Sequence, residues 1–277
     1  MLMKALEERR GLTASLLQVL EKLPILSCYV KTHGWNYIVS WLHRLTGIGL
    51  VIYLGVHIYT LSSLSTPSVY DAKMSWMSQP IIVFFAWASS LMVGFHALNG
   101  GRLILYESFG NRNDETMIRW TFGLTALYAI LLGLLMLLGD QNVSAVFFWL
   151  LIFFTALSTA YAVASRIWRT RHTMWWKLQR ISGAFLLIAI PAHLVFSHLN
   201  PGVAHEAQAV IARMQNVFIR FIDIVLAASA LYHAGYGLYS ILMDYVSAGA
   251  ARTGLTALIV IVVAVFAFLA FKLTLFI

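Results

Sequence analysis

The sequence is poor in charged residues and almost free of cysteine. Charged residues make up 11% of the 277 positions, whereas an average soluble domain is about a quarter charged. Hydrophobic residues make up 60%, and the mean hydropathy of +0.79 excludes an ordinary water-soluble fold. With Cys28 alone, the chain cannot form an internal disulfide, and it lacks the thiolates for an iron–sulfur cluster or a cysteine zinc site of its own.

Sequence motifs for binding nucleotides, flavins or nucleic acids are missing as well. Any carbon chemistry that needs such a cofactor would therefore belong to partner chains. The first 33 residues are charged and amphipathic, and no small-residue cleavage site follows a short apolar core. We expect no removable signal peptide, and we assign residues 1–38 to an amphipathic segment on the cytoplasmic side.

Long apolar runs are what the sequence does contain. Each is long enough to cross about 30 Å of hydrocarbon at about 1.5 Å per residue. The runs lie near residues 39–64, 79–105, 119–139, 145–166, 178–199, 218–243 and 253–276. Short polar or turn-forming stretches, such as Asn200-Pro201-Gly202, separate them. The sequence thus predicts an all-α, polytopic membrane helix bundle with about seven transmembrane helices.

The lysine and arginine residues predict the orientation of this bundle. Cytoplasmic loops retain positive charge during insertion. With the N-terminus in the cytoplasm, all lysines and arginines fall on that side except Lys73, Arg213, Arg220 and Lys272. We therefore expect a multi-pass protein of the inner membrane. Its basic rim suits anionic headgroups or an acidic docked partner better than nucleic acid.

An internal repeat emerges when the chain is compared with itself. Arg44-Leu45-Thr46-Gly47 falls on Arg180-Ile181-Ser182-Gly183, and the same shift brings His57 onto His193. A shift that is one residue longer brings Phe95-His96-Ala97 onto Tyr232-His233-Ala234, Gly100 onto Gly237 and Glu107 onto Asp244. The first three helices therefore resemble the last three.

The repeat predicts the domain organisation. We expect two parallel three-helix repeats, residues 39–139 and 171–277. A three-helix unit that starts inside the cell ends outside it, so a second copy in the same orientation needs one extra crossing. Residues 140–170 contain a helix without charged residues from Gln141 to Ser165, and we interpret it as this linking helix.

Four histidines lie deep in the predicted helices, where a polar side chain is costly and indicates function. His57 and His193 are roughly 12 to 15 Å from the outer helix ends, and His96 and His233 roughly 24 Å. One histidine from each repeat at one depth can supply the two axial imidazoles of a haem iron. The sequence thus predicts an outer pair and an inner pair, for two haems b, or for one at minimum.

Haem propionates would need polar partners near the inner surface. Candidates there are His43, Arg44, Arg102 and Arg180. A bundle histidine can instead form a plain hydrogen bond between helices, and this interpretation stays open, more so for His57 and His193 than for His96 and His233.

Three strings of residues resemble one known family. They are Ser40-Trp41-Leu42-His43-Arg44-Leu45-Thr46-Gly47, then Phe95-His96-Ala97-Leu98-Asn99-Gly100-Gly101-Arg102, and Tyr232-His233-Ala234-Gly235-Tyr236-Gly237 followed by Asp244-Tyr245. The first two are similar to the S-x-x-H-R-x-[ST]-G opening and the haem helix of the cytochrome b anchor of succinate dehydrogenase, or complex II. The third resembles the haem helix and D-Y ending of the second small anchor in that complex. The chain thus resembles a fusion of both anchor types.

This resemblance implies a function and partners. An anchor of a succinate dehydrogenase or fumarate reductase holds a flavoprotein and an iron–sulfur subunit on the cytoplasmic face. It passes electrons between them and membrane quinone, and the direction of flow stays open. His96 and His233 would ligate the inner haem, and His43 would contact a haem propionate.

The resemblance also implies a quinone site of Ser40, Arg44, Asp244 and Tyr245. Arginine, serine and tyrosine can hydrogen-bond quinone oxygens, and the aspartate could relay protons. The additional pair, His57 and His193, resembles the di-haem class, in which quinone can bind near the outer haem, so both positions stay open. Two haems favour a low-potential quinone such as menaquinone.

Two other functions stay open from the sequence. A proton-coupled transporter could use the histidines as relays, but it would favour acidic residues at the membrane midplane. A cytochrome b of another quinol oxidoreductase would bind the same haem, and its co-purifying subunits would distinguish it.

Overall fold

The computed structural model describes residues 24–139, 141–199, 205–247 and 249–276, and within these it contains helices and short connections but no strands. Seven helices are long and apolar enough to cross a membrane. They are α2 (Pro24–Leu61), α4 (Pro80–Phe109), α5 (Asp114–Leu138), α6 (Ala145–Ile167), α7 (Met174–Leu199), α10 (Val217–Met243) and α11 (Gly249–Phe276). The predicted all-α membrane bundle with seven spans is therefore confirmed.

The residues at the helix ends explain where the helices start and stop. Gly34 has a φ of 77°, which breaks α2, and the apolar span begins there rather than at the predicted residue 39. Pro80 is the first residue of α4, a position whose backbone N–H would have no partner within the helix. Gly110 ends α4 in a left-handed conformation, with its N–H donating to the Leu105 carbonyl. The Asn216 side chain caps the first turn of α10.

Two short helices were not predicted from the sequence. They are α3 (Pro67–Met77) and α9 (Ala207–Met214), and they occupy connections for which we expected only turns. Their apolar faces pack together in a cluster with the ends of α2 and α11, made of Leu64, Tyr70, Ala207, Val210, Met214 and Leu273. Asp71 also accepts a hydrogen bond from the Ala207 N–H (2.9 Å). We call this side of the bundle the α3–α9 end and the opposite side the Arg44 end.

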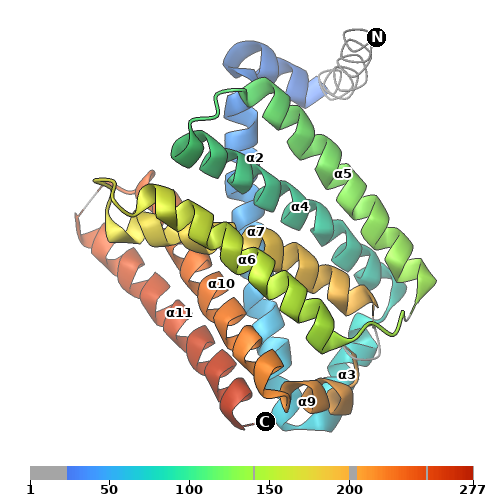
Figure 1. Ribbon diagram of the computed structural model, residues 1–277. Coiled ribbons are helices and arrows are strands. Elements are labelled where there is room, and N and C mark those ends of the chain that lie inside the picture. The colour runs from blue at the N-terminus through green and yellow to red at the C-terminus, as the bar shows by residue number, and fades with distance from the viewer. Residues whose placement is uncertain (1–23, 140, 200–204, 248, 277) are drawn as a thin grey trace.

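Four helices form the centre of the bundle (Figure 1). α2 packs against α4 and α10, and α7 packs against the same two helices. α2 and α7 therefore face each other across one diagonal of the centre, and α4 and α10 face each other across the other. α5 packs on α4, α6 on α7 and α11 on α10, so each peripheral helix covers one helix of the centre.

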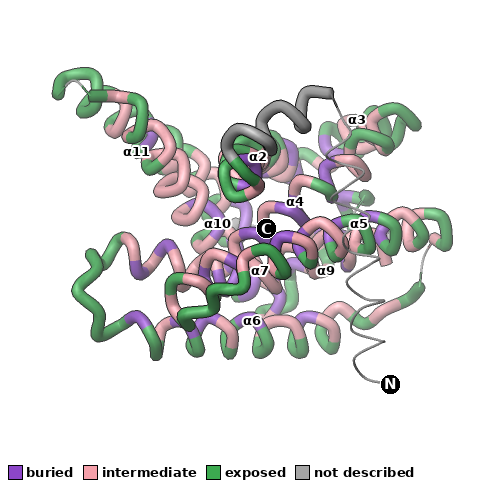
Figure 2. The backbone as a smooth tube through the Cα atoms, turned by 90° about the horizontal axis from the view of Figure 1, so that it is seen from above, coloured by how far each residue is buried: buried purple, intermediate pink, exposed green. Residues whose placement is uncertain are grey.

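Burial follows this arrangement. Buried positions concentrate where the central helices meet, and exposed positions lie at the periphery (Figure 2). The exposed side chains include many large apolar ones, such as Leu137 at 85% and Phe147 at 72%. Exposing an apolar surface of this extent to water would be unfavourable, whereas lipid chains can cover it. The chain is thus a multi-pass membrane protein, and its orientation stays a prediction.

Two sequence predictions fall partly outside the described residues. The amphipathic segment 1–38 is described only from residue 24, and the turn Asn200-Pro201-Gly202 is not described.

Candidate functional site

The four deep histidines meet in pairs across the two diagonals of the bundle. His96 on α4 and His233 on α10 have ring centres 6.3 Å apart, with the ring planes at 89°. His57 on α2 and His193 on α7 have ring centres 6.0 Å apart, at 81°. We call them the α4–α10 pair and the α2–α7 pair. Each pair joins helices that have no extensive backbone contact with each other, so the rings occupy the centre of the bundle.

These separations suit two imidazoles on one metal ion. Metal–imidazole bonds of about 2 Å, with the ring radii added, put the centres of two rings on opposite sides of an iron about 6 Å apart. A porphyrin supplies the other four iron ligands itself. The described residues contain no cluster of three or more histidine, cysteine, aspartate or glutamate side chains that could hold a metal ion, and a haem does not need one.

Hydrogen bonds orient the rings of the α4–α10 pair. His96 Nδ1 lies 3.1 Å from the His43 carbonyl oxygen, and Thr46 Oγ1 is 3.4 Å away. The carbonyl can only accept, so Nδ1 carries the proton and Nε2 is left as the metal-binding nitrogen. His233 Nδ1 lies 3.4 Å from Ser182 Oγ, which is the repeat-related contact.

Glycines let α2 and α7 approach these rings closely. A Cβ added to Gly47 would lie 3.0 Å from His96 Cε1, and a Cβ added to Gly183 would lie 3.0 Å from His233 Cε1. Any larger residue would therefore force the imidazole to shift by a few tenths of an ångström. This explains why glycine follows Thr46 and Ser182 in the two repeated strings.

Two buried polar atoms beside the α4–α10 pair have no hydrogen-bond partner in the part of the chain that the structure describes. They are His43 Nδ1 and Gln179 Oε1. The His43 ring stacks on the His96 ring, with centres 4.0 Å apart, and Gln179 Nε2 donates to the His233 carbonyl (3.3 Å). Leaving a buried polar atom unpaired costs about 1–3 kcal/mol. His43 Nδ1, when protonated, could donate to a haem propionate, so this residue fits the cofactor, whereas Gln179 Oε1 can only accept a hydrogen bond.

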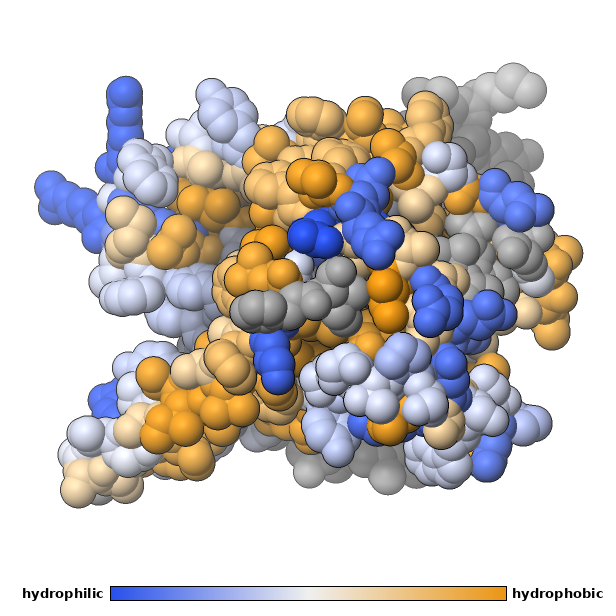
Figure 3. All heavy atoms as spheres, turned by 90° about the horizontal axis from the view of Figure 1, so that it is seen from below, coloured by the Kyte–Doolittle hydropathy of each residue, from blue (hydrophilic) through white to orange (hydrophobic). Residues whose placement is uncertain are grey.

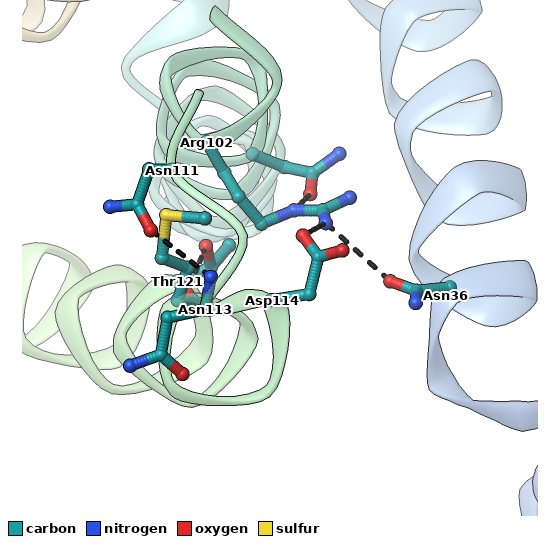
Figure 4. Close-up of polar contacts among 8 residues, drawn as sticks. Asn36, Arg102, Asn111, Asn113, Asp114 and Thr121 are labelled. Carbon is teal, nitrogen blue, oxygen red and sulfur yellow. Dashed lines mark hydrogen bonds and ion pairs between the residues drawn. The ribbon is translucent and has the colours of Figure 1, made fainter. Parts of the chain in front are cut away.

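The two arginines predicted for the propionates already bind carboxylates of the protein. Buried Arg102 pairs with Asp114 (2.7 Å), donates from Nε to Asn99 Oδ1 (2.9 Å) and from Nη1 to Asn36 Oδ1 (3.5 Å). These bonds tie α4 to α5 and α2 (Figure 4). Arg180 donates to both carboxylate oxygens of Glu107, at 2.5 and 2.9 Å.

A polar corner joins the middle of α2 to the residues that directly follow α10. Arg44 Nη2 lies 2.7 Å from Asp244 Oδ2, and Arg44 Nη1 donates to the Tyr245 hydroxyl (3.0 Å). The Trp41 ring lies 6.3 Å from the Tyr245 ring, and both face the guanidinium. Ser40 lies one turn before Arg44 and is exposed. Three of the four predicted quinone residues are thus in mutual contact.

An apolar cavity of about 190 Å³ lies below this corner, between α2, α10 and α11. It begins at Leu242, two residues before Asp244, and continues along α10 to Leu231 and along α11 to Phe266. Eleven residues of helix correspond to roughly 16 Å. The cavity therefore extends from the polar corner deep into the apolar part of the bundle.

Sequence reasoning missed Trp149 and Arg213, which lie near the α2–α7 pair, and also Asp223. The ring centres of Trp149 on α6 and His193 lie 5.9 Å apart. The sequence predicts only a linking role for α6. Arg213 of α9 and Asp223 of α10 interact electrostatically with each other. An acidic residue inside an apolar run is a recognisable signal, and Asp223 could have been found by it. The contacts of Trp149 and Arg213 depend on tertiary packing.

Comparisons with known proteins add to this geometry. A family model described as "Succinate dehydrogenase/Fumarate reductase transmembrane subunit" matches residues 25–135 and 155–271. Over 88 residues, the chain is 34% identical to the succinate dehydrogenase 2 membrane subunit SdhC of Mycobacterium tuberculosis (strain ATCC 25618 / H37Rv). That match covers 30% of this chain and 64% of the relative, so the chain spans slightly less than two thirds of the relative's length. No solved structure was found to match.

Proposed function

The chain belongs to the succinate dehydrogenase/fumarate reductase transmembrane subunit family, and from this we propose that it is the haem b-binding anchor of a succinate:quinone oxidoreductase. In this role it docks a flavoprotein and an iron–sulfur subunit on its cytoplasmic face. It passes electrons between them and membrane quinone. The distribution of lysine and arginine favours the inner membrane, with the N-terminus in the cytoplasm.

The two histidine pairs support this function most directly. Bound haem supplies one-electron transfer between ferrous and ferric iron. His96 and His233 would hold one haem and His57 and His193 a second, and two imidazoles leave no open position for oxygen. His43 would donate from its unpaired Nδ1 to a propionate of the first haem. Arg102 and Arg180 would instead keep the helix ends in place through their ion pairs.

The polar corner is the proposed quinone site. Arg44 and the Tyr245 hydroxyl would donate hydrogen bonds to quinone oxygens, and Asp244 would accept or deliver the protons that accompany reduction. Ser40, exposed one turn away, would complete the site from the side of the docked subunits. The apolar cavity below the corner would receive the prenyl tail, since its lining offers only apolar contacts.

We further propose that the chain is a fusion of two anchor units. The family model matches two separate stretches of the chain. The Arg44–Asp244 ion pair has a repeat-related counterpart in Arg180–Glu107. α6 would then be the linking helix between the units. Two haems in series favour a low-potential quinone such as menaquinone.

Electron transfer in the purified complex tests the proposed function. We expect flavin and iron–sulfur subunits to co-purify with the chain. Under anaerobic conditions, succinate or a menaquinol should reduce the haem, and quinone or fumarate should reoxidise it. His233→Ala should remove the contribution of the haem held by the α4–α10 pair from this signal, whereas His172→Ala, at an exposed histidine, should behave like the wild type. A complex without flavin, or haem that exchanges electrons with neither couple, would contradict the proposal.

A further inference from the structure

Four cationic side chains lie at the α3–α9 end: Lys73, Arg213, Arg220 and Lys272. This end of the molecule presents hydrophilic residues between apolar ones (Figure 3). Arg220 Nε donates to the Met214 carbonyl (3.0 Å), and Lys73 Nζ lies 4.2 Å from the centre of the Tyr59 ring. Arg213 differs from them, because its Nε is buried and has no hydrogen-bond partner among the described residues.

Arg213 lies close to the α2–α7 pair. Its guanidinium carbon is 5.9 Å from the centre of the Phe196 ring. Phe196 is buried one turn after His193 on α7, and both rings contact the ring of Trp149. The charge of Arg213 also acts on both His57 and His193. A buried guanidinium nitrogen without a partner thus lies near the pair of rings.

Arg213 also lies near Tyr70 of α3, on the side away from the histidine rings. Burial raises the pKa of Tyr70, and the nearby Arg213 opposes this increase. Tyr70 packs with Val210 and Met214 of α9 in the cluster that closes the α3–α9 end. Arg213, which is partly exposed but has a buried Nε, therefore lies between this cluster and the histidine rings.

Among the described residues, no carboxylate forms an ion pair with Arg213. Asp223 interacts with it electrostatically, but no ion pair within 4 Å joins the two among the described contacts. At the Arg44 end, by contrast, Arg102 and Arg180 both hold a carboxylate of the chain. Arg213 is partly exposed, but its buried and unpaired Nε is costly unless an anion compensates it. Its planar fork is best matched by a carboxylate.

We propose that Arg213 binds the propionate carboxylates of the haem held by His57 and His193. This inference rests on the proposed function, because it requires the second haem. The haem held by the α4–α10 pair would meet a hydrogen-bond donor at the Arg44 end, the Nδ1 of His43. The two haems would therefore direct their propionates toward opposite faces of the membrane.

Redox titration of the purified complex, followed by haem absorbance without substrate, tests this inference. The wild type should show two haems. Arg213→Gln should lower the reduction equilibrium constant of one haem about tenfold, or about 59 mV for one electron, because a nearby positive charge favours the reduced iron. Arg220→Gln, a matched control at the same end, should leave both haems unchanged. Loss of that one haem in Arg213→Gln alone would also support the inference.

Two haems with unchanged potentials in Arg213→Gln would overturn the inference and leave the proposed function intact. A single haem in the wild type would instead remove the proposed second haem, and the inference with it. If the Arg213→Gln protein does not accumulate in cells, the same redox titration of Arg213→Lys tests the inference instead. Lysine keeps the positive charge but cannot bind a carboxylate with two parallel hydrogen bonds. The reduction potential of one haem should therefore change more in Arg213→Lys than in Arg220→Gln. Equal haem potentials in these two variants would overturn the inference.

Discussion

At the scale of single residues, the four deep histidines differ from the exposed ones in their surroundings. His96 Nδ1 is held by a backbone carbonyl and a threonine, and a glycine lies against its ring. Depth and the repeat were enough to select these histidines from the sequence. The unpaired nitrogen of His43 and the ion pair of Arg102 with Asp114 could not be foreseen, because they depend on how α2, α4 and α5 pack.

Tyr245 gives a residue-scale prediction. Its hydroxyl accepts from Arg44, so its own proton is free to donate to a quinone oxygen. Tyr245→Phe should lower kcat/KM for quinone about tenfold, which corresponds to one hydrogen bond of about 1.4 kcal/mol. The haem spectrum should stay unchanged.

Tyr106→Phe is the matched control for this prediction. Tyr106 lies near the end of α4, where its ring faces Arg112 rather than Arg44. The Tyr106→Phe substitution should leave kcat/KM for quinone at the wild-type value. Equal kinetics for Tyr245→Phe and the wild type would remove Tyr245 from the quinone site.

At the scale of helices, length and hydropathy predict the seven spans because each must cross the same thickness of hydrocarbon. The short α3 and α9 escaped prediction because eight to eleven residues carry little periodic pattern, and their stability comes from the packing of Tyr70 against Val210 and Met214. The repeat predicts two similar halves, yet the peripheral helices differ. Tyr128 of α5 donates to the Pro191 carbonyl of α7 (3.0 Å), whereas α11 leaves a cavity beside α2 and α10.

This cavity gives an element-scale prediction. Val262 of α11 lines it, whereas Val260, on the same helix, does not and is 60% exposed. Val262→Phe should fill part of the cavity and raise KM for a long-tailed quinone several-fold. The added phenyl ring would occupy space that the prenyl tail needs, so apolar contacts of the tail would be lost. The KM for a short-tailed analogue should change little.

The same substitution at Val260 is the control, since it adds a phenyl ring only to the lipid-facing side. Its steady-state kinetics with both quinones should match the wild type. Equal effects of the two variants on long-tailed and short-tailed quinones would show that the cavity does not hold the tail.

At the scale of the whole molecule, the sequence predicts orientation and duplication, but not which helices face each other. That α2 opposes α7 and α4 opposes α10 follows from contacts between distant segments. The membrane orientation is a prediction at this scale, because lysine and arginine are concentrated in the loops at the Arg44 end.

Labelling of introduced cysteines in intact cells tests the orientation. With Cys28 replaced by Ser, a membrane-impermeant thiol reagent should label Gln141→Cys at the α3–α9 end. It should not label Arg112→Cys at the Arg44 end until the cells are opened. The reverse pattern would invert the proposed orientation.

The central claim is that the two histidine pairs each hold a haem. A reduced-minus-oxidised spectrum of the purified complex, combined with a haem count per chain, tests it most directly. The predicted result is two haems b per chain, falling to one in His57→Ala and one in His96→Ala. One haem in the wild type would remove the α2–α7 pair from the account, and a chain without haem would contradict it entirely.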